Sequence, residues 1–411
     1  MLSFKFTWLR HASLFVPLLV AGCGGSTQET VAFSTRTPAF YYAHAAAVKD
    51  GTVYSWGYNA NGQLGAGGTS GNTRYLVDPV TVASNVPPLE GVTDVAVGGS
   101  HTLAFRNVSG ATMWAWGNNG YGQVGTGDTN VQTSAMTVKR EGGAELISVK
   151  GVAAGTDFSL AVRWDGTVWS WGSNNYGQLG DSGSERALAK PINGLSGIQQ
   201  VAAGSYHGLA LTADGKVFGW GRNDYGQLGV GSTGSPATET APVAIAFPDG
   251  IEIIAIAAGG LNSYAIDSTN RVWAWGYNQF GQVGKPKLED QERQPTPQRV
   301  PGLPGIVQIS AGLDHCLALG ADGTVWGWGY NGYGQIGRAE VPSVPDDKDY
   351  PTPQLITGIE GAVVKIRAVG HYSLAFTADS VWAWGSNAQG QLAQGEGDKK
   401  PSGIPRRVGG F

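Results

Sequence analysis

The stretch from Leu317 to Gly337 reads LALGADGTVWGWGYNGYGQIG, and a phrase within it recurs through the chain. An aromatic residue followed by x-Trp-Gly occurs seven times, and twelve of the fourteen tryptophans lie in this phrase. The glycine that ends it is Gly57, Gly117, Gly172, Gly221, Gly276, Gly329 and Gly385. The intervals between these glycines, 60, 55, 49, 55, 53 and 56 residues, indicate a repeat protein.

Each repeat predicts a small antiparallel sheet. Alternation in Val-Trp-x-Trp places both rings on one face of a strand. Asp-Gly before this strand, as in Asp322-Gly323, is typical of a tight hairpin because glycine adopts a positive φ. Leu-Ala-Leu, a valine-rich segment such as residues 201–204, and Pro-x-x-Val such as residues 297–300 supply the other strands. Four such strands, buried on both faces, predict an all-β, seven-bladed β-propeller with four-stranded antiparallel blades.

The two ends of the chain predict how the ring closes. The first repeat lacks a Pro-x-x-Val segment before its Asp50 turn, whereas residues 405–411 match residues 297–303 in pattern. We therefore expect the C-terminal strand to join the N-terminal blade and close the ring. Closure would remove exposed strand edges, which otherwise promote aggregation. Residues 38–411 are then a single propeller domain.

The N-terminal segment predicts export. In residues 1–22, Lys5 and Arg10 precede an apolar run from Ala12 to Val20 that is too short to span a bilayer. The sequence up to Cys23 resembles a bacterial lipobox, which implies a lipoprotein signal peptide and a lipid on Cys23. Gly24 then favours the outer membrane, and residues 23–37 form a flexible tether. An ordinary signal peptide or a buried N-terminal segment are the alternatives.

Composition limits the partners. The formal charge of −4 becomes −6 once residues 1–22 are removed, because that segment has two positive side chains and no negative ones. A mildly acidic chain has no electrostatic attraction to nucleic acid or anionic lipid, so we expect neither as a partner. Cys316 is the only cysteine besides Cys23 and is expected to be inert and buried. We expect a monomer that needs no cofactor.

Three motifs together carry a family resemblance. They are Ala-Ala-Gly-x-x-His-x-Leu-Ala-Leu, Asp-Gly-x-Val-x-x-Trp-Gly and Asn-x-x-Gly-Gln-Leu-Gly. Over residues 38–411 the chain resembles proteins built from the regulator of chromosome condensation repeat, which implies a seven-bladed propeller. The eukaryotic founder of that family binds nucleosomes and exchanges nucleotide on a Ran-type GTPase, but this chain is predicted to be exported and lacks a basic tail. Exported relatives include a propeller-type β-lactamase inhibitor protein, which binds its target through aromatic side chains on one face. The resemblance implies the fold more firmly than the activity.

Two polar residues recur in every loop after the tryptophan strand. The asparagine is Asn59, Asn119, Asn174, Asn223, Asn278, Asn331 and Asn387, and the glutamine is Gln63, Gln123, Gln178, Gln227, Gln282, Gln335 and Gln391. A residue repeated seven times is better explained by a structural task repeated seven times, and we expect both to bind backbone groups of the loop.

The histidines that follow residue 22 all lie near one repeat position; they are His44, His101, His207, His315 and His371. Converging imidazoles could hold a metal ion. However, Phe158 and Asn262 replace histidine in two repeats, and no cysteine or carboxylate joins the set. We therefore expect hydrogen bonds to the neighbouring loop and no metal site.

One loop position varies in a way that indicates recognition. The residue before Gly-Gln is aromatic in five consecutive repeats and polar in the other two: Asn61, Tyr121, Tyr176, Tyr225, Phe280, Tyr333 and Gln389. Three further rings lie three residues earlier in the loops, at Tyr58, Tyr277 and Tyr330. We predict that these eight rings bind a protein partner, because tyrosine offers contact area at a small entropic cost. The alternative is that they brace each loop against the next blade. Insertions at residues 285–299 and 338–350 are candidate specificity loops on the same side.

Signals for catalysis are weak. Residues 229–234 match G-x-G-x-x-G but lie between two predicted strands, and Asp165 and Asp214 are turn residues. We predict an envelope-anchored lipoprotein that binds a protein through one loop face and is not an enzyme. Alternatives are an inhibitor of an extracytoplasmic enzyme such as a β-lactamase or cell-wall enzyme, a glycan-active enzyme, and a GTPase regulator.

Overall fold

The structure is a computed structural model that describes residues 32–33, 44–69, 74–80, 89–231, 237–286, 292–338, 349–395 and 397–409. The predicted signal peptide (residues 1–22) and Cys23 lie outside the described residues. So does the predicted tether, apart from Ala32 and Phe33. The described part of the chain contains no helix long and apolar enough to span a membrane.

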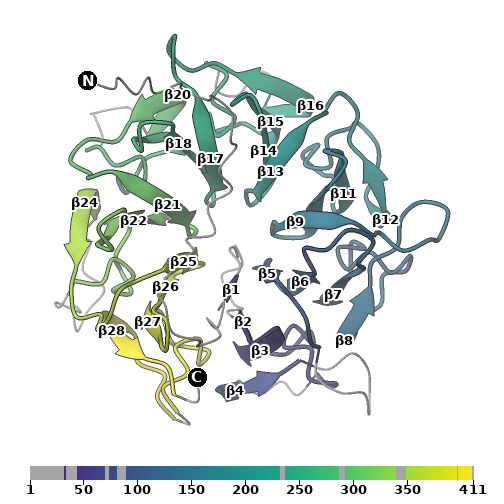
Figure 1. Cartoon of the computed structure of the whole chain (residues 1–411), viewed down its shortest axis with the longest axis horizontal. Coiled ribbons are helices and arrows are strands. Elements are labelled where there is room, and N and C mark those ends of the chain that lie inside the picture. Colours follow the sequence, from purple (N-terminus) through teal and green to yellow (C-terminus); the bar gives the residue numbers. More distant parts are fainter. Residues whose placement is uncertain are drawn as a thin grey trace, which may run out of the picture.

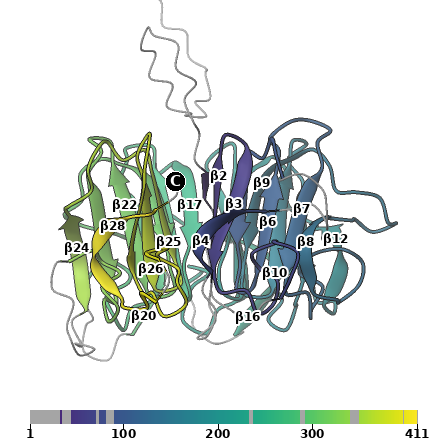
Figure 2. The ribbon, with the colours of Figure 1, turned by 90° about the horizontal axis from the view of Figure 1, so that it is seen from below.

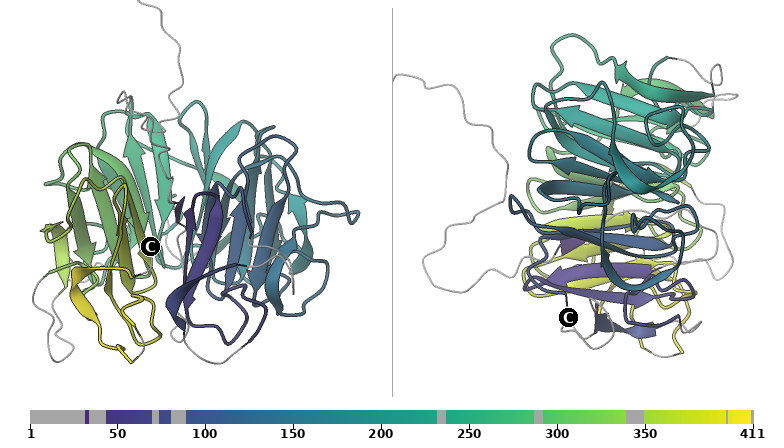
Figure 3. Two further views of the ribbon diagram at one scale, coloured as in Figure 1. Left: turned by 60° about the horizontal axis from the view of Figure 1, so that its bottom comes forward. Right: turned by 90° about the vertical axis from the view of Figure 1, so that its right-hand side faces the viewer.

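Four-stranded antiparallel sheets stand around a central channel like the blades of a propeller (Figure 1). Six of them are built from strands of four to eight residues. The sheet at the N-terminal end has an inner strand of only two residues, β1 (Ala32–Phe33). Seen from the side, the blades form a thick disc whose strands run between two loop-bearing faces (Figures 2 and 3). The predicted all-β propeller of four-stranded antiparallel blades is confirmed.

In each sheet the chain runs from the channel outward. The N-terminal sheet continues with β2 (His44–Lys49), β3 (Thr52–Gly57) and β4 (Arg74–Pro79). The second and third blades are β5 (Asp94–Val97), β6 (His101–Phe105), β7 (Met113–Gly117) and β8 (Gln132–Thr137), then β9 (Val149–Ala154), β10 (Phe158–Arg163), β11 (Val168–Gly172) and β12 (Arg186–Pro191). The fourth is β13 (Ile198–Ala203), β14 (His207–Thr212), β15 (Val217–Arg222) and β16 (Thr238–Ile245).

The remaining three blades follow the same plan. The fifth is β17 (Ile253–Ala258), β18 (Asn262–Asp267), β19 (Val272–Tyr277) and β20 (Arg293–Arg299). The sixth is β21 (Ile306–Ala311), β22 (His315–Gly320), β23 (Val325–Gly329) and β24 (Tyr350–Ile356), and the seventh is β25 (Lys365–Val369), β26 (Tyr372–Phe376), β27 (Val381–Gly385) and β28 (Ser402–Arg407).

The glycine that ends each tryptophan strand has a structural reason. Its φ lies between 96° and 108° in all seven copies, a region that side chains rarely adopt. At Gly221 a Cβ would also come within 2.5 Å of the Tyr206 carbonyl oxygen. The tight approach between this strand end and the turn before β14 therefore requires glycine.

The predicted mode of ring closure is wrong. β28 pairs with β27 of its own blade, in the register Trp382↔Arg407. The N-terminal sheet instead has its own outer strand, β4, which pairs with β3 in the register Tyr54↔Pro79. The Pro-x-x-Val segment thus belongs to the blade of the tryptophan strand before it. The sequence pattern alone did not show which of its two neighbours each such segment pairs with.

Side chains close the ring instead. The Trp56 indole donates to the Gln391 carbonyl oxygen at 2.9 Å, and the Tyr372 hydroxyl donates to the His44 carbonyl oxygen at 2.8 Å. Residues of the first, second and last sheets also share one apolar cluster, which includes Trp56 and Leu374. The contact between the first and last sheets therefore resembles the other contacts between neighbouring blades.

Those other contacts repeat one hydrogen bond. The tryptophan directly before the final glycine of each phrase is fully buried. It donates its indole N–H to the carbonyl oxygen of the loop glutamine in the preceding blade. With Trp56 to Gln391, the pairs are Trp116 to Gln63, Trp171 to Gln123, Trp220 to Gln178, Trp275 to Gln227, Trp328 to Gln282 and Trp384 to Gln335, at 2.8–3.0 Å. A buried indole N–H needs an acceptor, so this bond fixes how each blade sits on the next.

Candidate protein-binding surface

We call the end of the disc that carries the Asn-x-x-Gly-Gln loops and the Gly-x-x-His turns the loop face, and the opposite end the turn face. On the loop face, Ser173 N donates to the Asp157 carbonyl oxygen at 2.8 Å. On the turn face, Ile198 N donates to the Gly166 carbonyl oxygen at 3.1 Å. These contacts show that the loop after the tryptophan strand and the turn before the second strand share one face, and that the hairpin turn and the segment before the first strand of the next blade share the other.

Each loop on the loop face is held by its own asparagine and glutamine. In the fourth blade, Asn223 Oδ1 accepts from Leu228 N at 3.0 Å and Gln227 Oε1 accepts from Tyr225 N at 2.9 Å. Both bonds recur in all seven loops. The predicted structural role is confirmed. The glutamine also fixes the backbone of the variable residue, because it binds the amide of that residue.

Four histidines occupy equivalent places between blades. Their Nε2 atoms lie 2.9 Å from a strand hydroxyl of the next blade, in the pairs His44 with Thr102, His101 with Ser159, His207 with Ser263 and His315 with Ser373. The predicted hydrogen bonding is confirmed, although the partner is a strand side chain and not a loop. Within the described ranges, no group of three or more His, Cys, Asp or Glu side chains could hold a metal ion.

These interface groups are unsuited to binding or chemistry. Burial lowers the pKa of His101 to about 3, and burial with a nearby histidine does the same for His44 and His315. Cys316 is fully buried, and burial raises the pKa of its thiol. The expectation of an inert, buried cysteine is confirmed.

His371 differs from the other histidines. In the last blade Tyr372 pairs with Gly385, which is the place of His315 opposite Gly329 in the sixth blade. His371 therefore lies one residue earlier, in the turn on the loop face. Its ring centroid is 5.3 Å from that of Tyr333 and 5.9 Å from that of Tyr330. The five histidines thus lie near one repeat position, as the sequence indicated, but His371 is displaced from the other four by one residue.

Aromatic side chains on the loop face form two rows of ring contacts, Tyr176–Tyr206 and Tyr225 to His371, and Arg222 connects the two. We call this set of rings the aromatic belt; it consists of Tyr176, Tyr206, Tyr225, Tyr277, Phe280, Tyr330, Tyr333 and His371. Centroid distances are 5.0 Å for Tyr176–Tyr206, 4.8 Å for Tyr225–Tyr277, 6.3 Å for Tyr277–Phe280, 5.0 Å for Phe280–Tyr330 and 6.2 Å for Tyr330–Tyr333. The belt runs from the third blade to the seventh.

Six of the eight rings predicted from the sequence belong to the belt. Tyr121 does not: its side chain is 40% exposed, and it makes no ring contact within the described part of the chain. Tyr58, half-buried in the loop of the first sheet, lies one blade beyond His371. In the two candidate specificity loops, residues 287–291 and 339–348 lie outside the described residues, and residues 293–299 of the first are not loop but strand β20.

The belt both braces the loops and remains accessible. Tyr176, Tyr225, Phe280 and Tyr333 each contact a ring of the following blade. The same rings are only partly covered, and Tyr333 is still 41% exposed. The geometry therefore supports the bracing alternative and leaves a rigid aromatic surface available to a partner.

Arginine joins the belt where its aromatic contacts would otherwise break. The Arg222 guanidinium lies 5.0 Å from the Tyr176 ring centroid and 5.8 Å from that of Tyr225, and so links the two rings. Its Nε donates to Asp224 Oδ2 at 2.5 Å. Sequence analysis missed Arg222, Tyr206 and His371. Tyr206 and His371 could have been found by comparing the turn residue just before the second strand of each repeat.

Carboxylates lie beside the belt. Asp157 Oδ1 accepts from Gln123 Nε2 at 3.2 Å, and burial raises the Asp157 pKa to about 6. Asp314 Oδ1 accepts from Gln282 Nε2 at 3.4 Å. These residues occupy the same turn position as Tyr206 and His371, so in the third, fourth, sixth and seventh blades this position presents an acid or a ring on the loop face, whereas it is Ser100 in the second blade and Leu261 in the fifth.

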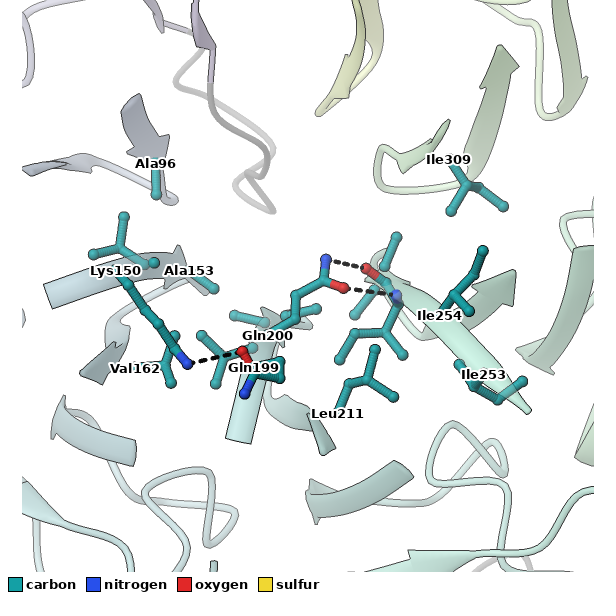
Figure 4. A pocket seen from close by; sticks show the side chains of 18 of the residues that line it. Ala96, Lys150, Ala153, Val162, Gln199, Gln200, Leu211, Ile253, Ile254 and Ile309 are labelled. Atoms are coloured by element: carbon teal, nitrogen blue, oxygen red, sulfur yellow. Dashed lines mark hydrogen bonds between the residues drawn. The ribbon is translucent and has the colours of Figure 1, made fainter. Parts of the chain in front are cut away.

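The inner strands enclose a cavity in the central channel. It has a volume of about 1070 Å³ and is lined by the inner strands β5, β9, β13, β17, β21 and β25. Figure 4 shows Lys150 bonded to Gln199 at 3.0 Å, and Gln200 bonded to the backbone of Ile256. Asp94 lies 3.4 Å from Lys365 and 3.5 Å from Arg367. The first two contacts join neighbouring inner strands, and the Asp94 pairs join β5 of the second blade to β25 of the seventh across the N-terminal sheet, so these polar groups of the channel wall are explained by structural contacts.

The turn-face carboxylates are likewise structural. Asp165 Oδ1 accepts from the Thr167 amide at 3.0 Å, and Asp214 pairs with Lys216 at 2.8 Å. Gly229 lies in a turn between β15 and β16, with a φ of 72°.

Comparison with known families identifies the repeat. Residues 39–301 match the RCC1-like domain. Residues 306–335 and 322–376 match the Regulator of chromosome condensation (RCC1) repeat.

Individual relatives agree with this match. The chain is 32% identical to the ultraviolet-B receptor UVR8 of Arabidopsis thaliana over 86% of this chain and 77% of the receptor. It is 31% identical to the E3 ubiquitin-protein ligase HERC2 of Homo sapiens over 78% of this chain, but it spans only 5% of that protein's length.

Solved structures show the same architecture. Prp20p of Saccharomyces cerevisiae has 25% identity and a TM-score of 0.71, with 86% of this chain and 85% of that chain covered. Human WBSCR16 has 22% identity and a TM-score of 0.72, with 87% and 94% covered, and supports the fold alone.

Proposed function

This chain belongs to the RCC1-like domain family, and from that premise we propose that it is a protein-binding module whose contact surface is the loop face. The aromatic belt carries this proposal. Its rings, joined by Arg222 between Tyr176 and Tyr225, extend across five blades, they are partly exposed, and the backbone of their loops is bonded to asparagine and glutamine side chains. A rigid aromatic surface loses little entropy on binding and suits a broad protein partner better than a small substrate.

One relative supports a role in protein binding. Prp20p, which has the same architecture, binds Gsp1p and histones. We do not transfer those partners, because the present chain is formally acidic and its predicted export signal would separate it from nuclear proteins. What we transfer is the use of an RCC1-type propeller as a surface for another protein, without an enzymatic activity of its own.

We further propose that the mature chain is a monomer anchored in the cell envelope by a lipid on Cys23. The direction of β1 supports an anchor on the turn face, opposite the aromatic belt. Ala32 pairs with Val48 and Phe33 pairs with Ala47, and β2 ends at the Asp50 turn, so the chain enters β1 from the turn face. An anchor upstream of β1 therefore attaches to the face opposite the belt and leaves the belt pointing away from the membrane.

Belt-dependent capture tests the binding proposal. Full mature chain would be immobilised and exposed to solubilised proteins of the native envelope, beside a Tyr176→Ala/Tyr225→Ala variant. Trp164→Ala is a matched control, because Trp164 is a 50% exposed ring on the turn face. We expect the double variant to lose the captured protein and the control to retain it. Capture that survives the double variant would contradict the proposal.

The anchor needs a separate test. Mass spectrometry of the mature chain should find a lipid on Cys23, and Cys23→Ser should release the protein from the membrane fraction. An unmodified Cys23 thiol, or membrane association that persists in Cys23→Ser, would disprove the anchor without affecting the binding proposal.

A further inference from the structure

We propose that the part of the belt on the fifth and sixth blades takes an arginine side chain from the partner, held between Phe280, Tyr330 and Tyr333 beside Asp314. This inference rests on the proposed function and adds to it the chemistry of the partner: an exposed arginine in a protein segment.

The molecule itself contains a guanidinium held in the same manner. Arg222 lies within 5.0–5.8 Å of three ring centroids, those of Tyr176, Tyr206 and Tyr225. Asp224 supplies the carboxylate. A cation within about 6 Å of a ring centroid is attracted by the negative face of the ring. The fourth blade thus shows that the spacing of belt rings accommodates a planar cation.

Two blades further on, the equivalent positions hold a ring in place of the cation. Arg222 ends the tryptophan strand of the fourth blade, and Tyr330 stands directly after the corresponding strand of the sixth. The rings that flank Arg222, Tyr176 and Tyr225, correspond to Phe280 and Tyr333. The sixth blade therefore has the surrounding rings, with the partly exposed Tyr330 and no arginine of its own at this position.

Negative charge accompanies these rings. Asp314 occupies the turn position that Tyr206 occupies beside Arg222, and its backbone oxygen accepts from Tyr330 N at 2.8 Å. Burial, together with the nearby carboxylates of Glu292 and Asp314, raises the pKa of Tyr277 to about 12. The electrostatic potential at this part of the belt therefore favours a positive group.

Arginine fits this arrangement better than lysine. Its guanidinium is planar, so it can stack on one ring while it donates two hydrogen bonds to a carboxylate. It is also more weakly hydrated than an ammonium group, so less hydration is lost when it enters a partly covered site.

A peptide pair tests the inference without any knowledge of the partner. The full mature chain would be titrated by NMR with acetyl-Gly-Arg-Gly-amide and with the same peptide containing citrulline, which is neutral and nearly isosteric. We expect the arginine peptide to bind about fivefold more tightly, as a cation–π contact beside a carboxylate predicts. Tyr330→Ala and Asp314→Asn should each reduce the affinity about threefold or more, whereas Tyr330→Phe and the control Trp164→Ala should retain it.

The outcomes separate this inference from the proposed function. Equal affinity for the two peptides, or unchanged binding in Tyr330→Ala, would overturn the arginine site whatever the envelope capture shows. If protein capture depends on Tyr176 and Tyr225 while the two peptides bind alike, the binding module stands and the arginine site falls. If the arginine peptide is preferred but no captured protein depends on the belt, the site stands and the protein-binding proposal falls.

Discussion

The interfaces between blades and the rim of the loop face follow opposite rules. At the interfaces, one tryptophan, one glutamine and, in four blades, one histidine with a hydroxyl partner recur with nearly the same distances. At the rim of the loop face, the residue before the second strand of a blade is, for example, Asp157, Tyr206, Asp314 or His371. The residue after the Trp-Gly pair is Arg222 in one blade and Tyr330 in another. Repetition marks contacts that every pair of neighbouring sheets must make, whereas variation marks positions that the fold leaves free for recognition. Perturbing one region and then the other should therefore separate stability from binding.

Acid should act mainly through the buried histidines. The pKa of His44, His101 and His315 at the interfaces is about 3 in the folded chain, and that of His371 on the loop face is about 4, because burial disfavours the charged form, against 6.5 when unfolded. Their contribution to stability is complete above pH 6.5 and is lost as the pH falls through the folded-state pKa of each group. Each pH unit below 6.5 costs about 1.4 kcal/mol per histidine, on the order of 8 kcal/mol for these four at pH 5.

Urea unfolding at pH 7.5, 6 and 5 measures this loss. His101→Gln should remove about a quarter of this pH dependence, because one of the four histidines with a lowered pKa is gone. A free energy of unfolding that stays constant between pH 7.5 and 5 would show that these rings do not resist protonation.

Removing one interface tryptophan should have the next largest effect. Trp220 is fully buried, and its indole donates to the Gln178 carbonyl oxygen at 2.9 Å. Trp220→Ala leaves a cavity and an acceptor without its donor, so we expect a loss of about 4 kcal/mol in urea or thermal unfolding. Trp164→Ala, on the exposed turn face, should change stability by less than about 0.5 kcal/mol. Equal effects of the two changes would contradict the contrast between interface and surface.

At the rim the effect should shift from stability to binding. Tyr176 and Tyr225 are half-buried and contact Tyr206 and Tyr277. Their double replacement by alanine should weaken partner binding by about 2 kcal/mol or more but lower stability by only about 1 kcal/mol. Both quantities should be measured on the same variant. A variant that unfolds early yet binds normally while folded would give the belt a purely structural role.

Asp157 should show a small effect with the opposite pH dependence. Burial raises the pKa of Asp157 from 3.8 to about 6, because it disfavours the ionised carboxylate. The folded protein therefore has its full stability, as far as this group is concerned, below pH 3.8 and loses part of it as the pH rises through 6. Asp157→Asn should therefore stabilise the protein by about 1–2 kcal/mol at pH 7.5, after allowance for partial exposure, and have no effect near pH 4. Unfolding of both forms at the two pH values would measure this, and destabilisation at pH 7.5 would show that the ionised carboxylate is needed.

Much of the fold could be predicted from local sequence. The tryptophan phrase and its period indicated blades, because alternation and hairpin turns are properties of a few adjacent residues. The roles of Asn223 and Gln227 were also predictable, since both act within their own loop. The pairing of β28 was not, because a Pro-x-x-Val strand lies between two tryptophan strands along the chain and the pattern favours neither.

The candidate site divides in the same way. The sequence by itself determined that Tyr176, Tyr225, Phe280 and Tyr333 occupy equivalent loop positions on consecutive repeats. Only the tertiary structure decided that they meet Tyr206, Arg222, Tyr277, Tyr330 and His371 in one continuous belt, and that Tyr121 stays outside it. These contacts join residues of different blades. Their distances depend on how closely one sheet packs on the next and on which turn residue faces each loop, neither of which is encoded in the spacing along the chain.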